Sequence, residues 1–115
     1  MIQTGIDIIE VKRIKKIIQT NKKFLEKVYT STEVSYCNSK KNKWQHFAVR
    51  FAAKEAVWKA LGKKDIWHRD IMVKNAEDGK PEVILSQKYK KLQNKISLSL
   101  SHTDEYAAAI AIYVP

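Results

Sequence analysis

Two carboxylates of this 115-residue chain lie in unusually apolar stretches. Asp7 interrupts an apolar run near the N-terminus, and Glu55 lies in RFAAKEAVWKALG, which is apolar at most positions. The interior of a strand rarely contains a carboxylate unless something is bound there. Lys59 follows Glu55 by one helical turn, and His102 lies in a Ser-His-Thr segment. Oxygen ligands beside lysine and histidine are the groups that hold Mg²⁺ against phosphate.

Each of these residues also has a simpler interpretation. Glu55 and Lys59 have the i,i+4 spacing of an ion pair on a wet helix face, worth about 0.2–0.5 kcal/mol. Asp7 is equally compatible with a capping or turn aspartate that ends the first strand. His102 alone is typical of a hydrogen-bonded turn histidine. The residues taken singly therefore leave structural and catalytic roles open.

The elements that must position these residues follow from the apolar periodicity and the turn chemistry. In the first half we expect a short strand over 2–9, interrupted by Gly5 and Asp7, a basic amphipathic helix over 10–19, a short helix around 24–28, a helix that begins at the capping box Thr30–Glu33, and a long helix over 44–61 capped by Gly62. In the second half we expect a hairpin of strands around 71–73 and 83–85 joined by the turn 77–80, a short polar helix or loop over 86–94, a strand of strict alternation over 96–100, and an almost wholly apolar strand over 106–114.

Because helices cluster early and strands late, the predicted class is α+β, with a mainly antiparallel sheet and one long central helix. No repeat or linker divides the chain, so residues 1–115 are expected to form a single small domain. The last strand is apolar at nearly every position, as is typical of a central strand covered on both faces or buried in a subunit contact.

The long helix is predicted to be apolar on nearly every side. Its small residues Ala52, Ala56 and Ala60 form one stripe, which lets neighbouring backbone approach closely. Its charges fall in two separate sectors, one of which holds Arg50 and Lys54. Since such a helix is packed on most sides, we expect its charges to face solvent, a ligand or another chain.

Composition narrows the function further. Lys and Arg outnumber Asp and Glu by 22 to 12, a net charge of +10, which predicts a polyanionic partner: nucleic acid, an acidic protein or a phosphorylated small molecule. The single cysteine, Cys37, and the lack of a leader or a long apolar span indicate a cytoplasmic protein without a membrane anchor. No glycine-rich phosphate loop, zinc-ligand spacing or nucleophile elbow is present.

Four motifs occur in order along nearly the whole chain: TGIDI at 4–8, RFAAKEA at 50–56 with KALG at 59–62, DGKP at 78–81, and SLSHT at 99–103 before YA at 106–107. Through them the sequence resembles the holo-acyl-carrier-protein synthases, the short bacterial class of 4′-phosphopantetheinyl transferases. The resemblance implies an enzyme of fatty acid and lipid metabolism that transfers phosphopantetheine from coenzyme A to a serine of apo acyl carrier protein, releasing adenosine 3′,5′-bisphosphate. It also implies a homotrimer with active sites in clefts between adjacent subunits.

The resemblance implies a role for each matching residue. Asp7 and Glu55 resemble the Mg²⁺ ligands, with Lys59 as a cation beside the diphosphate, and either Glu55 or a metal-held water as the base for the serine. Further coenzyme A contacts are implied at His102 and Thr103 (phosphate), Arg50 (the adenosine 3′-phosphate), Gly79, Lys80 and Pro81 (the adenine side), and Gly62. The acidic carrier protein is expected to meet Arg13, Lys12 and Lys16 of the basic helix, with Phe24 as an apolar contact.

Some features depart from the family pattern or allow other interpretations. Lys63 and Lys64 follow Gly62 where the family usually has threonine and glycine, and Ser86-Gln87 stands where it often has glycine. The basic helix is also compatible with a merely solvated face. A small nucleic-acid-binding module, with stacking on Trp44, Trp67 or Tyr89, would explain the charge but give Asp7 and Glu55 no role, so we expect no nucleic acid partner. A non-catalytic trimeric relative is the third alternative.

Overall fold

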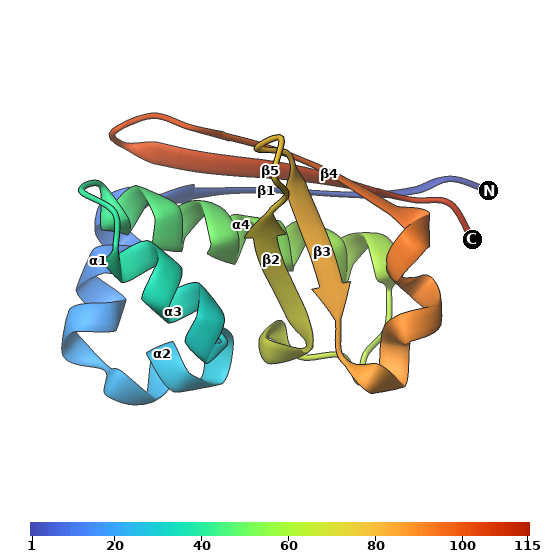
Figure 1. The fold of residues 1–115 in the computed structure, drawn as a ribbon, viewed down its shortest axis with the longest axis horizontal. Coiled ribbons are helices and arrows are strands. Elements are labelled where there is room, and N and C mark those ends of the chain that lie inside the picture. The colour runs from blue at the N-terminus through green and yellow to red at the C-terminus, as the bar shows by residue number, and fades with distance from the viewer.

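The helix α4 is the centre of the fold (Figure 1). In a computed structural model that describes all of residues 1–115, it lies across a three-stranded sheet, while the short helices and a two-stranded hairpin cover its other side. The elements in chain order are β1 (Gln3–Glu10), α1 (Val11–Thr20), α2 (Lys22–Val28), α3 (Ser31–Asn38), α4 (Lys43–Leu61), the 3-10 turn η1 (His68–Asp70), β2 (Ile71–Asn75), β3 (Pro81–Leu85), the 3-10 segment η2 (Gln87–Lys95), β4 (Ile96–His102) and β5 (Tyr106–Tyr113). This is the predicted small α+β domain with antiparallel strands. No helix combines the length and the apolar character needed to cross a membrane.

The larger sheet has the order β1-β5-β4, with both neighbours antiparallel to β5. The apolar last strand is therefore central, as predicted. β1 runs without interruption, so the expected breaks at Gly5 and Asp7 do not occur. Asp7 lies in the middle of the edge strand β1, where it pairs with Ala109 of β5, and does not cap the end of the strand.

Gly5 brings β1 directly against α4. A Cβ atom at this position would lie 1.9 Å from the carbonyl oxygen of Ala56 and 2.8 Å from the backbone nitrogen of Ala60, so no larger residue fits. Both alanines are buried, as is Ala109 of the facing strand. The alanine stripe predicted to allow close backbone approach is thus the surface on which the sheet packs. It also fixes Asp7, two residues further along β1, beside the helix.

The opposite face of the sheet is open and apolar. Ile6 and Ile110 lie directly opposite each other, and their exposed fractions are 66% and 39%. Ile8 and Ile112 lie on the same face, 68% and 37% exposed. The last strand is therefore covered on one face only within a single chain. Of the two alternatives that its apolar sequence left open, coverage on both faces by the chain itself is wrong, and burial in a subunit contact stays a prediction.

Several local predictions are confirmed. Thr30 and Glu33 form the capping box that begins α3, with each side chain accepting a hydrogen bond from the other residue's backbone N–H. Gly62 ends α4 in the left-handed conformation, with φ of 65°.

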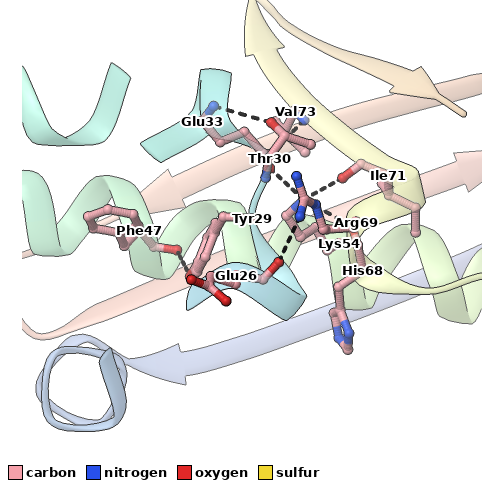
Figure 2. Close-up of polar contacts among 10 residues, drawn as sticks. All are labelled: Glu26, Tyr29, Thr30, Glu33, Phe47, Lys54, His68, Arg69, Ile71 and Val73. Carbon is pink, nitrogen blue, oxygen red and sulfur yellow. Dashed lines mark hydrogen bonds and ion pairs between the residues drawn. The ribbon is translucent and has the colours of Figure 1, made fainter. Parts of the chain in front are cut away.

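Lys54 overturns one prediction for the charges of α4. Its ammonium lies 2.7 Å from Oε1 of Glu33, and both side chains are fully buried. It also donates to the carbonyl oxygens of His68 and Ile71, while the other Glu33 oxygen accepts from the N–H of Val73 (Figure 2). Lys54 therefore faces neither solvent, a ligand nor another chain, because the fold supplies an internal carboxylate.

Candidate active site

Asp7 and Glu55 line one cavity of about 290 Å³ beside α1. Asp7 comes from β1 and Arg13 from α1. Glu55 comes from α4, one helical turn after Phe51. The cavity wall is completed by the apolar side chains Ile8, Ile9, Ile14, Ile17 and Phe51. Two carboxylates that are far apart in the sequence thus meet over an apolar floor, as the metal-site hypothesis requires.

Lys59 is the immediate partner of Asp7. Its ammonium donates to the carbonyl oxygen of Ile6 at 2.9 Å and lies 3.5 Å from Oδ1 of Asp7. Burial raises the pKa of Asp7, Lys59 opposes this rise, and the nearby Glu55 charge adds to it. Burying the charged form of Asp7 therefore costs free energy of folding, and the rest of the fold offsets this cost.

Glu55 is paired with a residue that the sequence did not single out. Nε2 of His68 lies 3.0 Å from Oε1 of Glu55, and the imidazole stacks on Phe51 with ring centroids 5.5 Å apart. The i,i+4 pair of Glu55 with Lys59 is not formed, because Lys59 turns toward β1 instead. Each carboxylate keeps one oxygen that accepts no hydrogen bond from the chain.

This donor set fits a hard divalent cation that is shared with a substrate. Carboxylate oxygens are the ligands that Mg²⁺ prefers, and Mg²⁺ usually takes one or two of them together with phosphate oxygens and water. No third His, Cys, Asp or Glu joins the two carboxylates in a closed metal cluster. Asp7 and Glu55 can thus hold the cation only in company with ligands from outside the chain.

A second, larger cavity of about 940 Å³ lies between the N-terminal half of α4, the β2–β3 hairpin and β4. It gathers most of the residues for which coenzyme A contacts were predicted: Arg50, Gly79, Lys80, Pro81 and His102. It shares no lining residue with the cavity of Asp7 and Glu55. Within one chain, therefore, the predicted phosphate contacts and the predicted metal ligands are not brought together.

Arg50 is the buried cation of this second cavity. Its side chain is 2% exposed, its guanidinium lies over the Tyr36 ring at 4.3 Å, and one of its nitrogens donates to Asn75. Its Nε is buried and has no hydrogen-bond partner in the chain. A buried guanidinium with an unused donor is suited to an incoming anion.

His46 lies beside His102 in the same cavity, with ring centroids 5.9 Å apart. Burial lowers the pKa of His46, and the cationic Arg50 acts in the same direction. No motif marks His46 in the sequence, where it is one polar residue in the first turns of the long helix α4.

Three residues with predicted catalytic or coenzyme A roles lie outside both cavities: Lys59, Gly62 and Thr103. Gly62 is exposed, with open space where a Cβ would lie. The Thr103 hydroxyl accepts from the N–H groups of Glu105 and Tyr106 and so closes the β4–β5 turn. That turn holds Thr103 one residue beyond His102.

The predicted carrier-protein residues are spread along α1 and α2. Lys12, Arg13 and Lys16 are exposed, while Arg13 also lines the Asp7 cavity. Phe24 is only partly exposed and packs on Phe51, with ring centroids 5.9 Å apart. The basic face of α1 therefore borders the cavity that holds the carboxylates.

Comparison with known proteins gives a consistent result. Residues 3–111 match the model of the 4′-phosphopantetheinyl transferase superfamily. The chain is 44% identical to a holo-[acyl-carrier-protein] synthase of Caldanaerobacter subterraneus subsp. tengcongensis over 117 residues, covering 96% of this chain and 92% of the relative.

Solved structures agree with this match. The fold is similar to a holo-(acyl-carrier-protein) synthase from Bacillus anthracis in complex with CoA (3′,5′-ADP), with a TM-score of 0.81, 36% identity and coverage of 96% and 94% of the two chains. It is also similar to the synthase of Helicobacter pylori in complex with coenzyme A, with a TM-score of 0.82, 31% identity and coverage of 96% and 99%.

Proposed function

Because this chain belongs to the 4′-phosphopantetheinyl transferase superfamily, among its holo-acyl-carrier-protein synthases, we propose that it transfers 4′-phosphopantetheine from coenzyme A to a serine of apo acyl carrier protein, with Mg²⁺ bound, in the cytoplasm. The serine oxygen forms a bond to the β-phosphorus of coenzyme A, and the bond from that phosphorus to the bridging oxygen breaks. Adenosine 3′,5′-bisphosphate leaves with that oxygen, and the serine proton passes to a base.

The shared cavity of Asp7 and Glu55 is the observation that carries this proposal. These two residues hold the Mg²⁺, which when bound offsets the negative charge that builds on the diphosphate as its bond breaks. Lys59 keeps one Asp7 oxygen oriented and supplies a fixed cation beside the site.

In the second cavity we assign the nucleotide end of coenzyme A. The buried Arg50 offers its guanidinium to the 3′-phosphate, and His102 offers its imidazole to a phosphate. Gly79, Lys80 and Pro81 line the adenine side. That coenzyme A is the substrate is supported by the similar synthases, which are described in complex with it. The choice of this cavity rests on its size and on the buried cation in its wall.

We further propose a homotrimer. Two observations support it: the open isoleucine face of the sheet, and the separation of the metal and nucleotide cavities within one chain. Burying that face between copies removes apolar surface from water. It also allows the carboxylate cavity of one copy to meet the nucleotide cavity of its neighbour, so that each site is completed by a second chain.

The acidic carrier protein is assigned to the exposed lysines of α1 and to Arg13 at the cavity mouth. Opposite charges there raise the rate of encounter and orient the carrier serine toward the carboxylates. Family membership favours this partner over nucleic acid, as do the two carboxylates, which would repel a polyphosphate unless a metal intervened.

The test is direct. The protein is incubated with coenzyme A, Mg²⁺ and an apo carrier protein, and the mass of the carrier is measured. We expect the gain of one phosphopantetheine arm and its loss when Mg²⁺ is chelated. Tight binding of RNA or DNA at physiological salt, with no mass gain on any carrier, would overturn the proposal.

A further inference from the structure

His68 makes one defined contact with Glu55. Its Nε2 lies 3.0 Å from Oε1, and the two side chains are 33% and 24% exposed. An ionised carboxylate only accepts hydrogen bonds, so Nε2 carries the hydrogen and donates it. Glu55 Oε1 is thereby occupied, and Oε2 has no donor from the chain.

His68 is held both at its ring and at its backbone. The ring stacks nearly parallel on Phe51, with an interplanar angle of 13°. The backbone carbonyl oxygen of His68 accepts from the buried Lys54 ammonium at 3.0 Å, and Lys54 is held by Glu33. Figure 2 shows the His68 ring directed away from these Lys54 contacts. The three-residue turn η1 is therefore anchored to α4 through its backbone, and Phe51 of the same helix supports the imidazole.

We propose that His68 is a positioning residue for Glu55, which fixes the carboxylate so that Oε2 serves the cation site. The proposal rests on the proposed function for the identity of that cation. Lys59 has the corresponding relationship to Oδ1 of Asp7, so each carboxylate has one oxygen occupied and one available. Hydrogen bonds of this kind orient metal ligands, and their removal typically weakens metal binding 10–100-fold.

Two substitutions separate the hydrogen bond from packing. His68→Phe keeps an aromatic ring on Phe51 but removes the donor, whereas His68→Gln restores an N–H donor at similar reach. Arg69→Gln is the matched control, because Arg69 lies on the same turn and donates to the carbonyl oxygen of Glu26 without touching Glu55. Thermal unfolding of all four proteins checks that the fold is kept.

The probe is Mn²⁺, titrated with saturating coenzyme A and followed by electron paramagnetic resonance. We expect His68→Phe to bind Mn²⁺ about tenfold more weakly and His68→Gln to recover most of the affinity. Arg69→Gln should match the unmodified protein. In transfer assays at fixed Mg²⁺, His68→Phe should lower kcat and leave the KM for carrier protein unchanged.

Equal Mn²⁺ affinity of His68→Phe and the unmodified protein would overturn the role of His68. Equal losses in Arg69→Gln would also overturn it, since they would point to the turn as a whole. An unmodified protein that binds Mn²⁺ but transfers nothing would overturn the proposed function, while the ratio of Mn²⁺ affinities would still decide about His68. Failure of the unmodified protein to bind Mn²⁺ would overturn both.

Discussion

The ammonium of Lys54 and the carboxylate of Glu33 lie 2.7 Å apart, with neither side chain exposed to solvent. Glu33 also caps α3 through Thr30 and accepts from the N–H of Val73 on β2. One ion pair thus joins α3 and β2 to α4. Burial lowers the pKa of Lys54, and Glu33 opposes that shift. Each charge therefore depends on the other to remain in the core.

Lys54→Met should lower the free energy of unfolding by about 3–5 kcal/mol, because it leaves Glu33 buried without its counter-charge. Chemical denaturation of the unmodified and variant proteins measures the difference. Lys88→Met is the control, since the Lys88 and Asp65 pair is exposed to water and its removal should change stability little. An equal loss in both variants would contradict a special role for the buried pair.

Glu55→Gln should leave the fold and assembly intact but reduce Mg²⁺-dependent transfer by about 100-fold or more, since a neutral amide is a poor cation ligand. The mass of the carrier protein, followed over time, gives the rate. Glu105→Gln, an exposed carboxylate at the β4–β5 turn, should transfer normally. Near-normal turnover of Glu55→Gln would remove Glu55 from the mechanism.

Asp7→Asn should raise the melting temperature in chelator at pH 7 while abolishing transfer. Burial raises the pKa of Asp7, so the folded state binds this proton more tightly than the unfolded state. The contribution of this proton to the free energy of unfolding is full at a pH below the pKa that Asp7 has in the unfolded chain. It is lost as the pH rises through the pKa that Asp7 has in the folded protein. The advantage of Asp7→Asn should therefore shrink as the pH approaches 4. A lower melting temperature at pH 7 would mean that the ion pair with Lys59 outweighs the burial.

Ile110→Asp should convert the proposed homotrimer to monomers, because it places a charge in the centre of the open sheet face. Light scattering coupled to size-exclusion chromatography measures the mass. Lys74→Asp on the exposed hairpin is the control and should stay trimeric. Transfer should fall with the trimer, since the two cavities of one chain remain apart. A fully active monomer would refute sites shared between copies.

Lys16→Glu should raise the KM for carrier protein at low salt and spare the KM for coenzyme A, since it reverses a charge on the exposed face of α1. The effect should diminish as salt is added. Lys90→Glu makes the same charge change on η2 and should leave both constants unchanged. Identical carrier KM values for Lys16→Glu and the unmodified protein would refute docking on α1.

The sequence alone determined most of the secondary structure, because periodicity, capping and turn chemistry are local properties. The capping box at Thr30 and the left-handed Gly62 follow from a few neighbouring residues. The apolar last strand could be placed at the centre of the sheet for the same reason. The family was likewise recognisable from the sequence, because the four motifs that resemble it, from TGIDI at 4–8 to SLSHT at 99–103, occur in order along nearly the whole chain.

Only the tertiary structure decided which side chains are partners. From α4 alone, the i,i+4 spacing offered Glu55 as the partner of Lys59, and Lys54 was expected to face solvent, a ligand or another chain. Because β1 lies directly against α4 at Gly5, Lys59 contacts Asp7, and because η1 lies beside α4, His68 contacts Glu55. Such choices depend on distances between segments that are remote in sequence, which no local pattern encodes. The separation of the two cavities was decided in the same way, by how α4 packs across the sheet.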